Sequence, residues 1–275
     1  MSGFEHGLSA VMIVKNAERY LPLVLRSLGK VADEIIVVDT GSTDTSRDIA
    51  RKYNCRIFES AWCDDFSKAK NYGIAQARFS WIMSVDADEV LYDVKAGDIL
   101  AGALTDADVP AYVIWVDNVY DYGRVEPVRM LRLFRNTPRL RFTNPVHESI
   151  GEALYAHWPG FVPPVLDIHL RHYGYLSANA IGKHERNIVL LQRWADAAPA
   201  NIYANYKLGG TLVEAGRRQE ALPYLERTFG LFAESRERGS YPFLETFFTL
   251  YGDLLVMEGL TDEAERCKSI VAGWK

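Results

Sequence analysis

The sequence predicts an α/β fold with a mostly parallel sheet flanked by helices, followed by a C-terminal helical region. Short apolar runs alternate with amphipathic stretches between residues 9 and 85, which is the pattern of consecutive βαβ units. Several of these runs end directly in polar clusters. After residue 175 the apolar runs stop and an internal helical repeat begins. We therefore predict two domains, residues 1–175 and 176–275.

Four apolar runs in the N-terminal half are interpreted as strands, and amphipathic stretches separate them. Strands and helices that alternate at this spacing form parallel pairs, so the carboxyl ends of the strands are expected at one edge of the sheet. Pro22 lies early in the first amphipathic stretch, where a helix tolerates proline. The predicted strands are residues 9–14, 33–38, 56–59 and 81–85, and the predicted helices are residues 17–28, 45–53 and 66–77.

The apolar run from Trp81 to Val85 leads directly into three carboxylates, Asp86, Asp88 and Glu89. Open α/β sheets bind ligands at this end of their strands. Crowding like charges beside a buried strand is costly unless a positive group neutralises them. A divalent cation that carries a phosphorylated ligand would do so, because hard cations take oxygen ligands. The alternative is an ordinary acidic turn, since short D-x-D triplets occur by chance.

Two other predicted strands also end in polar clusters. Lys15 and Asn16 follow the first strand, and Asp39, Gly41 and Ser42 follow the second. A carboxylate after the second strand, such as Asp39, could accept hydrogen bonds from the hydroxyl groups of a ribose or from the edge of a base. Glycine permits close approach of a ligand to the backbone, and the start of the next helix favours anions. The alternative is a βα turn in which aspartate and glycine serve the turn alone.

Four sequence blocks, taken together and in order, resemble the family 2 glycosyltransferases. The blocks are SAVMIVKN (residues 9–16), DEIIVVDTGSTDTS (33–46), FSKAKNYG (66–73) and WIMSVDADE (81–89). The resemblance is dense between residues 8 and 92 and looser onward to about residue 194. It implies a GT-A fold, a UDP-sugar donor, and Mn²⁺ or Mg²⁺ as the cofactor.

The resemblance also implies roles for individual residues. Asp39 matches the acid that contacts uracil or ribose in the family. Asp86 and Asp88 match its D-x-D motif for metal and diphosphate, with Asp88 as the more direct ligand. Lys70 and Asn71 fall in a segment that commonly lines the donor site. A solvated helix face is the alternative for Lys70.

A basic, alternating segment at residues 128–134 is predicted to be a strand, as is the apolar run at residues 111–116. The period of two in a strand separates Arg132 from Arg129 and Arg135. A planar guanidinium binds phosphate in a bidentate manner, so Arg129 or Arg132 could contact the donor, and we select Arg129. The alternative is that these arginines lie on the solvent-exposed face of an edge strand, and we favour this alternative for Arg135. The predicted donor-binding residues are Lys15, Asn16, Asp39, Gly41, Ser42, Lys70, Asn71, Asp86 and Arg129.

His147 and Glu148 lie side by side in the segment Asn144–Ser149. Inverting transfer needs a general base within hydrogen-bond distance of the acceptor. Family members contain a similar block, and on this resemblance Glu148 is the first candidate for the base and His147 the second. His147 could instead orient the diphosphate. A purely structural His–Glu pair is the alternative.

A late histidine completes the predicted metal site. GT-A enzymes often recruit such a residue as a third ligand, and His172, which precedes a turn at Gly174, is the best-placed candidate. The resemblance therefore implies that Asp86, Asp88 and His172 hold the ion. A structural role for His172 is the alternative.

The C-terminal region contains a long amphipathic segment, Ser177–Ala197, and then a repeat that is typical of tetratricopeptide-like helix pairs. Two repeats are fewer than such arrays need to stand alone, so we expect them to pack on the catalytic domain. Stabilisation of that domain, a homodimer interface and a groove for a peptide acceptor all remain open. The repeat is carried by Gly209, Gly216 and Ala221, which recur after 43 residues as Gly252, Gly259 and Ala264.

Composition excludes several classes of protein. The net charge of −5 argues against a general nucleic-acid binder. No stretch approaches the roughly 20 apolar residues that span a bilayer, and residues 1–7 do not have the features of a signal peptide. Three cysteines without a zinc-type spacing fit a reducing, cytoplasmic setting.

The function that the sequence predicts is metal-dependent, inverting transfer of a hexose from a UDP-sugar. The acceptor would be a hydroxyl or thiol of a peptide, a protein or a glycolipid core. One alternative is a sugar nucleotidyltransferase, although the usual Gly-rich N-terminal loop of that class is absent. The other alternative is a non-catalytic helical-repeat scaffold with a vestigial donor site.

Overall fold

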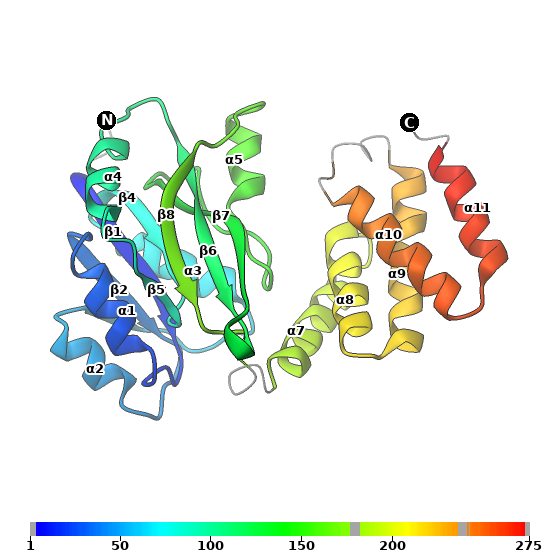
Figure 1. Cartoon of the computed structure of the whole chain (residues 1–275), viewed down its shortest axis with the longest axis horizontal. Coiled ribbons are helices and arrows are strands. Elements are labelled where there is room, and N and C mark those ends of the chain that lie inside the picture. The colour runs from blue at the N-terminus through cyan, green and yellow to red at the C-terminus, as the bar shows by residue number, and fades with distance from the viewer. Residues whose placement is uncertain (1–3, 177–181, 236–240, 242, 273–275) are drawn as a thin grey trace. The chain divides into compact units, whose positions relative to one another are not determined.

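The structure is a computed structural model that describes residues 4–176, 182–235, 241 and 243–272. Contacts divide the chain into two compact units, residues 1–181 and 182–275, and each is considered by itself (Figure 1). The boundary predicted after residue 175 lies just before this division.

The first unit contains an eight-stranded mixed sheet in the order β3-β2-β1-β4-β7-β6-β8-β5. Strands β3, β2, β1 and β4 are mutually parallel, as the βαβ alternation predicts. The second half adds antiparallel pairs, β4–β7, β6–β7 and β5–β8, and one parallel pair, β6–β8. The strands are β1 (Glu5–Val14), β2 (Glu34–Asp39), β3 (Arg56–Glu59), β4 (Phe79–Ser84), β5 (Glu89–Leu91), β6 (Ala111–Val119), β7 (Val125–Arg135) and β8 (Val165–His172).

Helices cover both faces of the sheet (Figure 1). One buried apolar cluster joins the sheet to α1 (Leu21–Leu28), α2 (Ser46–Lys52) and α4 (Ala96–Ala103). A second cluster joins the opposite face to α3 (Phe66–Ala75) and α5 (Gly151–His157). The predicted α/β fold, a sheet flanked by helices, is therefore confirmed. The sequence did not reveal α4, α5 or the three-residue strand β5, since each is short.

The helix predicted to begin at residue 17 begins four residues later. Residues 17 and 18 instead contact the start of α2 and the loop before it: the Ala17 N–H donates to Ser46 Oγ (2.8 Å) and the Glu18 N–H donates to Asp44 Oδ2 (3.1 Å). These bonds give partners to the main-chain N–H groups of two residues that precede α1. They also tie together the two loops that follow β1 and β2.

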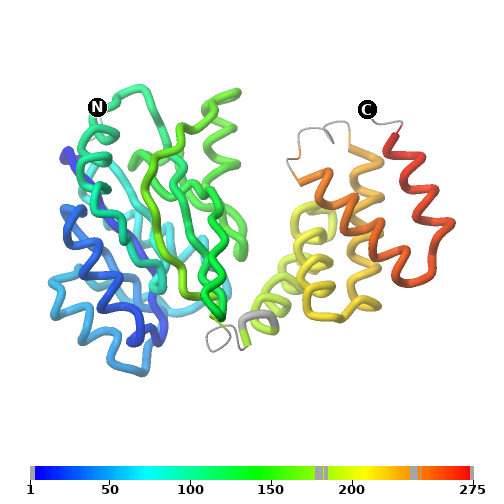
Figure 2. Tube along the Cα trace, viewed as in Figure 1, coloured from blue at the N-terminus to red at the C-terminus, as the bar shows by residue number. Residues whose placement is uncertain are grey.

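The described part of the second unit consists mainly of helices (Figure 2). Of the predicted helix Ser177–Ala197, residues 177–181 lie outside the described residues, and the remainder corresponds to the first helix of this unit. The described helices are α7 (Lys183–Ala197), α8 (Ile202–Glu214), α9 (Arg218–Glu234), α10 (Leu244–Met257) and α11 (Thr261–Ala272). Within the described residues, no helix combines the length and the apolar character needed to cross a bilayer.

Both repeats end their first helix in the same way. Gly216 and Gly259 adopt left-handed φ values of 76° and 77°. The next N–H closes the turn in each case, from Arg217 to the Leu212 carbonyl and from Leu260 to the Leu255 carbonyl, both at 2.8 Å. This is the Schellman closure, which favours glycine at the left-handed position. The tetratricopeptide-like character of the C-terminal region is therefore confirmed.

Candidate active site

The site lies where the strands of the sheet end. Strands β1, β2, β4, β6 and β8 all run in one direction, so their carboxyl ends share one edge. Asp86 and Asp88 follow β4 at this edge, and His172 is the last residue of β8. Long-range folding therefore brings the late histidine to the D-x-D segment.

Lys70 links two carboxylates that come from distant segments. Its Nζ lies 3.0 Å from Asp86 Oδ1 and 2.6 Å from Glu148 Oε1. The residue is 3% exposed, and its ammonium lies over the ring of Phe142. Burial alone would lower the pKa of Lys70, but the two carboxylates raise it above its ordinary value. Lys70 is therefore a buried cation, and the alternative of a solvated helix face does not hold.

Arg132 is the second buried cation of the site. Its Nη2 lies 2.9 Å from Asp86 Oδ2 and 2.5 Å from Glu89 Oε1, and the residue is 5% exposed. From the sequence, Arg129 and Arg132 were both candidates for contact with the donor, and Arg129 was selected. In the structure Arg129 is exposed on β7, and its guanidinium lies over the ring of Trp115. The alternating pattern separated the two arginines correctly. It could not show which of them faces the end of β4.

The two cations determine how the acidic groups titrate. Burial alone would raise the pKa of Asp86, but Arg132 and Lys70 hold it well below its ordinary value. Glu89 is fully buried, and its pKa is raised by that burial despite the opposing effect of Arg132. Asp86 is therefore a firmly ionised carboxylate, whereas Glu89 gains a proton more readily than an ordinary glutamate.

Asp88 and His172 form a pair beside this cluster. His172 Nδ1 lies 2.9 Å from Asn118 Oδ1, and His172 Nε2 lies 3.5 Å from Asp88 Oδ1. Because an amide oxygen accepts hydrogen bonds, Asn118 favours the tautomer in which Nδ1 carries the proton. The lone pair of Nε2 then faces Asp88, which is the arrangement that supports histidine as a metal ligand. Sequence analysis did not identify Asn118.

The residues present fit a divalent cation. Three carboxylates, Asp86, Glu89 and Glu148, contact two cations, Lys70 and Arg132, so carboxylates outnumber cations among these described groups. Asp88 and His172 provide an oxygen and a nitrogen that face each other. Among the described residues, no three acidic, histidine or cysteine side chains are grouped as a complete ligand set. Mg²⁺ sites of this kind usually complete their coordination with water and substrate phosphates.

The loop that carries His147 and Glu148 is anchored at both ends. Residues Thr143 and Ser149 form an antiparallel bridge. The Asn71 side chain holds the preceding residue, since it accepts from the Phe142 N–H and donates to the Phe142 carbonyl, both at 2.9 Å. His147 is exposed and has a left-handed φ of 53°. Asn71 therefore positions the loop, and its predicted contact with the donor stays a prediction.

Asp39 lies at the end of β2 and is 1% exposed. Its Oδ2 is 2.6 Å from Arg47 Nε, and the Ser42 N–H lies 3.1 Å from Oδ1. Burial alone would raise the pKa of Asp39, but Ser42 and Arg47 hold it below its ordinary value. The carboxylate is therefore ionised and already paired, and a ligand that uses it has to share it with Arg47.

The remaining predicted donor residues connect the loops after β1 and β2. The Asn16 N–H donates to Ser42 Oγ (3.0 Å), and Asn16 Oδ1 accepts from the Thr43 N–H (2.8 Å). Gly41 has a φ of 103°, which strains any other residue, and no atom lies within 4 Å of the position of a Cβ there. Lys15 is exposed at the same edge. The space at Gly41 leaves the backbone open to a ligand.

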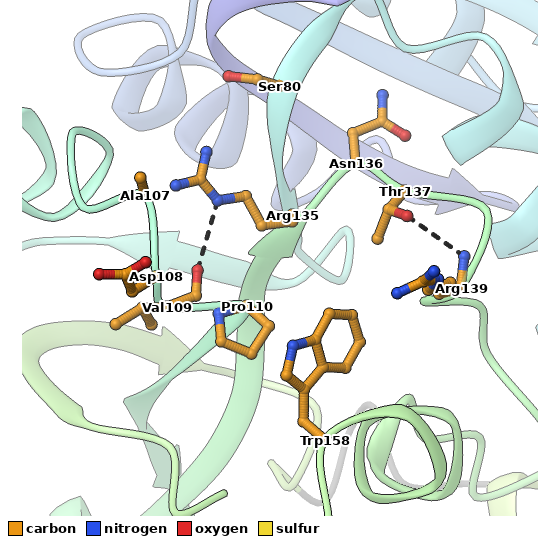
Figure 3. A pocket seen from close by; sticks show the side chains of 10 residues that line it. All are labelled: Ser80, Ala107, Asp108, Val109, Pro110, Arg135, Asn136, Thr137, Arg139 and Trp158. Atoms are coloured by element: carbon orange, nitrogen blue, oxygen red, sulfur yellow. Dashed lines mark hydrogen bonds between the residues drawn. The ribbon is translucent and has the colours of Figure 1, made fainter. Parts of the chain in front are cut away.

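A pocket of about 340 Å³ lies elsewhere, at the opposite edge of the sheet. Figure 3 shows its lining, in which the Arg135 side chain donates to the Val109 carbonyl beside Trp158. Ser80 and Pro110, at the starts of β4 and β6, also line it. Because it lies at the opposite ends of these strands from Asp86, this pocket is not part of the candidate site.

Comparison with known proteins agrees with this geometry. The model of the family described as "Glycosyl transferase family 2" matches residues 9–156, which is more than half of the chain. The chain belongs to glycosyltransferase family 2. The matched region contains the D-x-D segment, Lys70, Arg132 and the Glu148 loop.

Curated relatives share most of this chain. A TPR repeat-containing protein of Synechococcus elongatus is 35% identical over 80% of this chain and 56% of its own length. The glycosyltransferase SunS of Bacillus subtilis is 27% identical over 82% of this chain and 54% of its own length. The chain therefore spans about half the length of these relatives. The lipopolysaccharide core biosynthesis glycosyltransferase LpsC of Rhizobium meliloti is 30% identical over 58% of this chain and 65% of its own length.

Among solved structures, the Staphylococcus aureus protein TarS, residues 1–349, is similar to the chain with a TM-score of 0.55. The match covers 98% of this chain and 91% of that one at 15% identity. At this identity the similarity supports the fold alone.

Proposed function

We propose that the protein transfers a hexose from a UDP-sugar to a hydroxyl or thiol of an acceptor, with inversion at the anomeric carbon. The observation that carries this proposal is the grouping of Asp88 with His172 beside the Lys70–Asp86–Arg132 cluster at the carboxyl edge of the sheet. The similar TarS structure was determined in complex with UDP, which supports the choice of nucleotide.

Asp88 and His172 are proposed to hold Mn²⁺ or Mg²⁺, with Asp86 as the third ligand that the family resemblance implies. When bound, the ion would act as a Lewis acid that stabilises the charge on the departing diphosphate. Both Asp86 oxygens already accept from Lys70 or Arg132, but a carboxylate has further lone pairs. Asp86 thus keeps the two cations next to the position of the diphosphate.

Glu148 is proposed as the general base. Its carboxylate would accept the proton of the acceptor hydroxyl or thiol while the acceptor attacks the anomeric carbon. The new glycosidic bond forms as the bond to the diphosphate breaks, and UDP leaves with the bonding electrons. His147, the neighbouring residue, is the second candidate for the base. Orientation of the diphosphate is its other proposed role.

The acceptor is proposed to be a peptide, a protein or a glycolipid core. LpsC is named for lipopolysaccharide core biosynthesis, which favours a glycolipid. The helical unit, which has the tetratricopeptide-like pattern, favours a peptide or protein by analogy of fold. A homodimer formed through that unit and a cytoplasmic location stay predictions.

The test is release of UDP from a panel of UDP-sugars, without acceptor, in Mn²⁺, in Mg²⁺ and in EDTA. We expect slow hydrolysis of one sugar nucleotide that EDTA stops, because water can replace the acceptor. Release of pyrophosphate from a sugar phosphate and UTP would instead support the nucleotidyltransferase alternative. Neither hydrolysis nor thermal stabilisation by any UDP-sugar would contradict the proposal and favour a scaffold.

A further inference from the structure

Lys70 contacts the predicted base as well as the D-x-D segment. Its ammonium lies between Asp86 Oδ1 at 3.0 Å and Glu148 Oε1 at 2.6 Å. The Glu148 side chain is 16% exposed, so this ion pair is largely shielded from water. Opposite charges interact more strongly when water is excluded, so Glu148 and Lys70 are firmly coupled.

The two carboxylates differ in what else they contact. Asp86 has Arg132 as a second cationic partner at 2.9 Å. The ion pair that the structure gives Glu148 is with Lys70. If the Lys70 ammonium moves, Asp86 remains paired while Glu148 loses its close contact. The flexible four-carbon stem of lysine makes such a movement easier than it would be for a planar guanidinium.

We propose that Lys70 is a donor-responsive positioning residue: the diphosphate of the incoming UDP-sugar and the Glu148 carboxylate compete for its ammonium. This inference rests on the proposed function. The donor-free protein keeps Glu148 bound to Lys70. Donor binding draws the ammonium towards the phosphates and leaves Glu148 to accept a proton from the acceptor.

The physical basis is competition between anions for one buried charge. A diphosphate carries more negative charge than a single carboxylate and offers several acceptor oxygens. An ammonium has three N–H groups, but Glu148 and the diphosphate repel each other when both approach it. The two interactions therefore weaken each other, and by reciprocity Glu148 weakens UDP binding as much as UDP weakens the Glu148–Lys70 pair.

The experiment is calorimetric titration of the full chain with UDP in Mg²⁺, using two variants of Glu148. Glu148→Gln removes the charge, and Glu148→Asp keeps the charge but shortens the side chain so that it withdraws from Lys70. We expect both variants to bind UDP about fivefold or more tightly than the wild type, in the usual range of coupling between sites. Glu152→Gln, at an exposed position of α5, removes a nearby charge that does not contact Lys70 and should leave UDP affinity unchanged.

A second arm isolates Lys70. In a Lys70→Met background, Glu148→Gln should change UDP affinity by less than about twofold, because the shared cation is gone. Unchanged UDP affinity in both Glu148 variants would overturn the proposal. So would tighter binding in Glu148→Gln alone, because removal of charge rather than release of Lys70 would then explain the effect. A wild type that does not bind UDP at all would instead contradict the proposed function.

Discussion

The loops after β1 and β2 differ from the cluster after β4, although both contain an ionised aspartate paired with arginine: Asp39 is 1% exposed, and the Asp86 side chain is 34% exposed. Around Asp39 the partners are close in sequence: Ser42 and Arg47 lie within eight residues of it. Around Asp86 the partners come from α3 and β7, and Lys70 and Arg132 lie 16 and 46 residues away. One aspartate is held by its own turn and the other by the tertiary fold.

This difference indicates separate roles for the two regions. The Asp39 carboxylate and most polar groups of its turn have hydrogen-bond partners within the turn, so the turn is preorganised. The Asp86 region has more carboxylates than cations and a histidine whose Nε2 faces Asp88. We therefore expect substitutions in the Asp86 region to have a large effect on stability or on activity, depending on the residue, and substitutions in the Asp39 turn to have smaller effects.

The largest effect is expected for Arg132→Leu. Removal of this guanidinium leaves the fully buried Glu89 without its cation, and breaking a buried ion pair costs about 3–5 kcal/mol in the free energy of unfolding. Urea denaturation measures the change. Arg129→Leu, at an exposed position on the same strand, is the matched control and should change stability by less than about 0.5 kcal/mol. Equal stabilities of the two variants would show that Arg132 is not the cation on which the region depends.

The next effect is expected for Asp88→Asn. An amide is a weaker metal ligand than a carboxylate, so turnover of the UDP-sugar should fall about 100-fold or more while the melting temperature stays nearly unchanged. Assays of UDP release at increasing Mn²⁺ measure the loss. Asp98→Asn, on the exposed face of α4, is the control and should keep full activity. Full activity of the Asp88 variant would remove the argument for the metal.

The smallest effect is expected for Asp39→Asn, and it should depend on pH. The pKa of Asp39 is lower in the folded protein than its ordinary value of 3.8, so the ionised form stabilises the fold. This contribution is complete above the ordinary value and is lost as pH falls through the folded-state pKa. The variant should be about 1–3 kcal/mol less stable than the wild type at pH 7, and the two should converge in strong acid. Thermal melts across pH measure the difference; a gap that stays constant down to strong acid would contradict the pairing with Arg47.

Several residues that the sequence analysis grouped together lie close to each other in the structure, because motif residues and strand ends are local features. Asp86, Asp88 and His172 were placed at one edge by strand direction and by the family resemblance, and the structure brings Asp88 and His172 within 3.5 Å. The burial of Lys70 and its contact with Glu148 were not foreseen. A helical pattern shows which residues lie on the same face of the helix, but it does not show which loop covers that face.

Arg132 and Asn118 are two further residues whose place in the site could not be predicted from the sequence. Arg132 belongs to the site because β7 pairs antiparallel with β4, and Asn118 does because β6 pairs in parallel with β8, where it faces His172. Neither pairing follows from the alternation of strands and helices, which ends after β4. The structure therefore adds the residues that neutralise and orient the motif.

The sequence by itself determined the α/β alternation, the family and the acidic end of β4, because each depends on short-range pattern or on blocks of neighbouring residues. It also determined the helical repeat, whose glycines close equivalent turns. The tertiary structure decided which cations meet Asp86 and which tautomer of His172 is favoured. It also decided that Glu148 and Asp86 share one lysine. Those features depend on the packing of α3, β6, β7 and the Glu148 loop around a common edge, and burial there makes each charge dependent on partners far away in the chain.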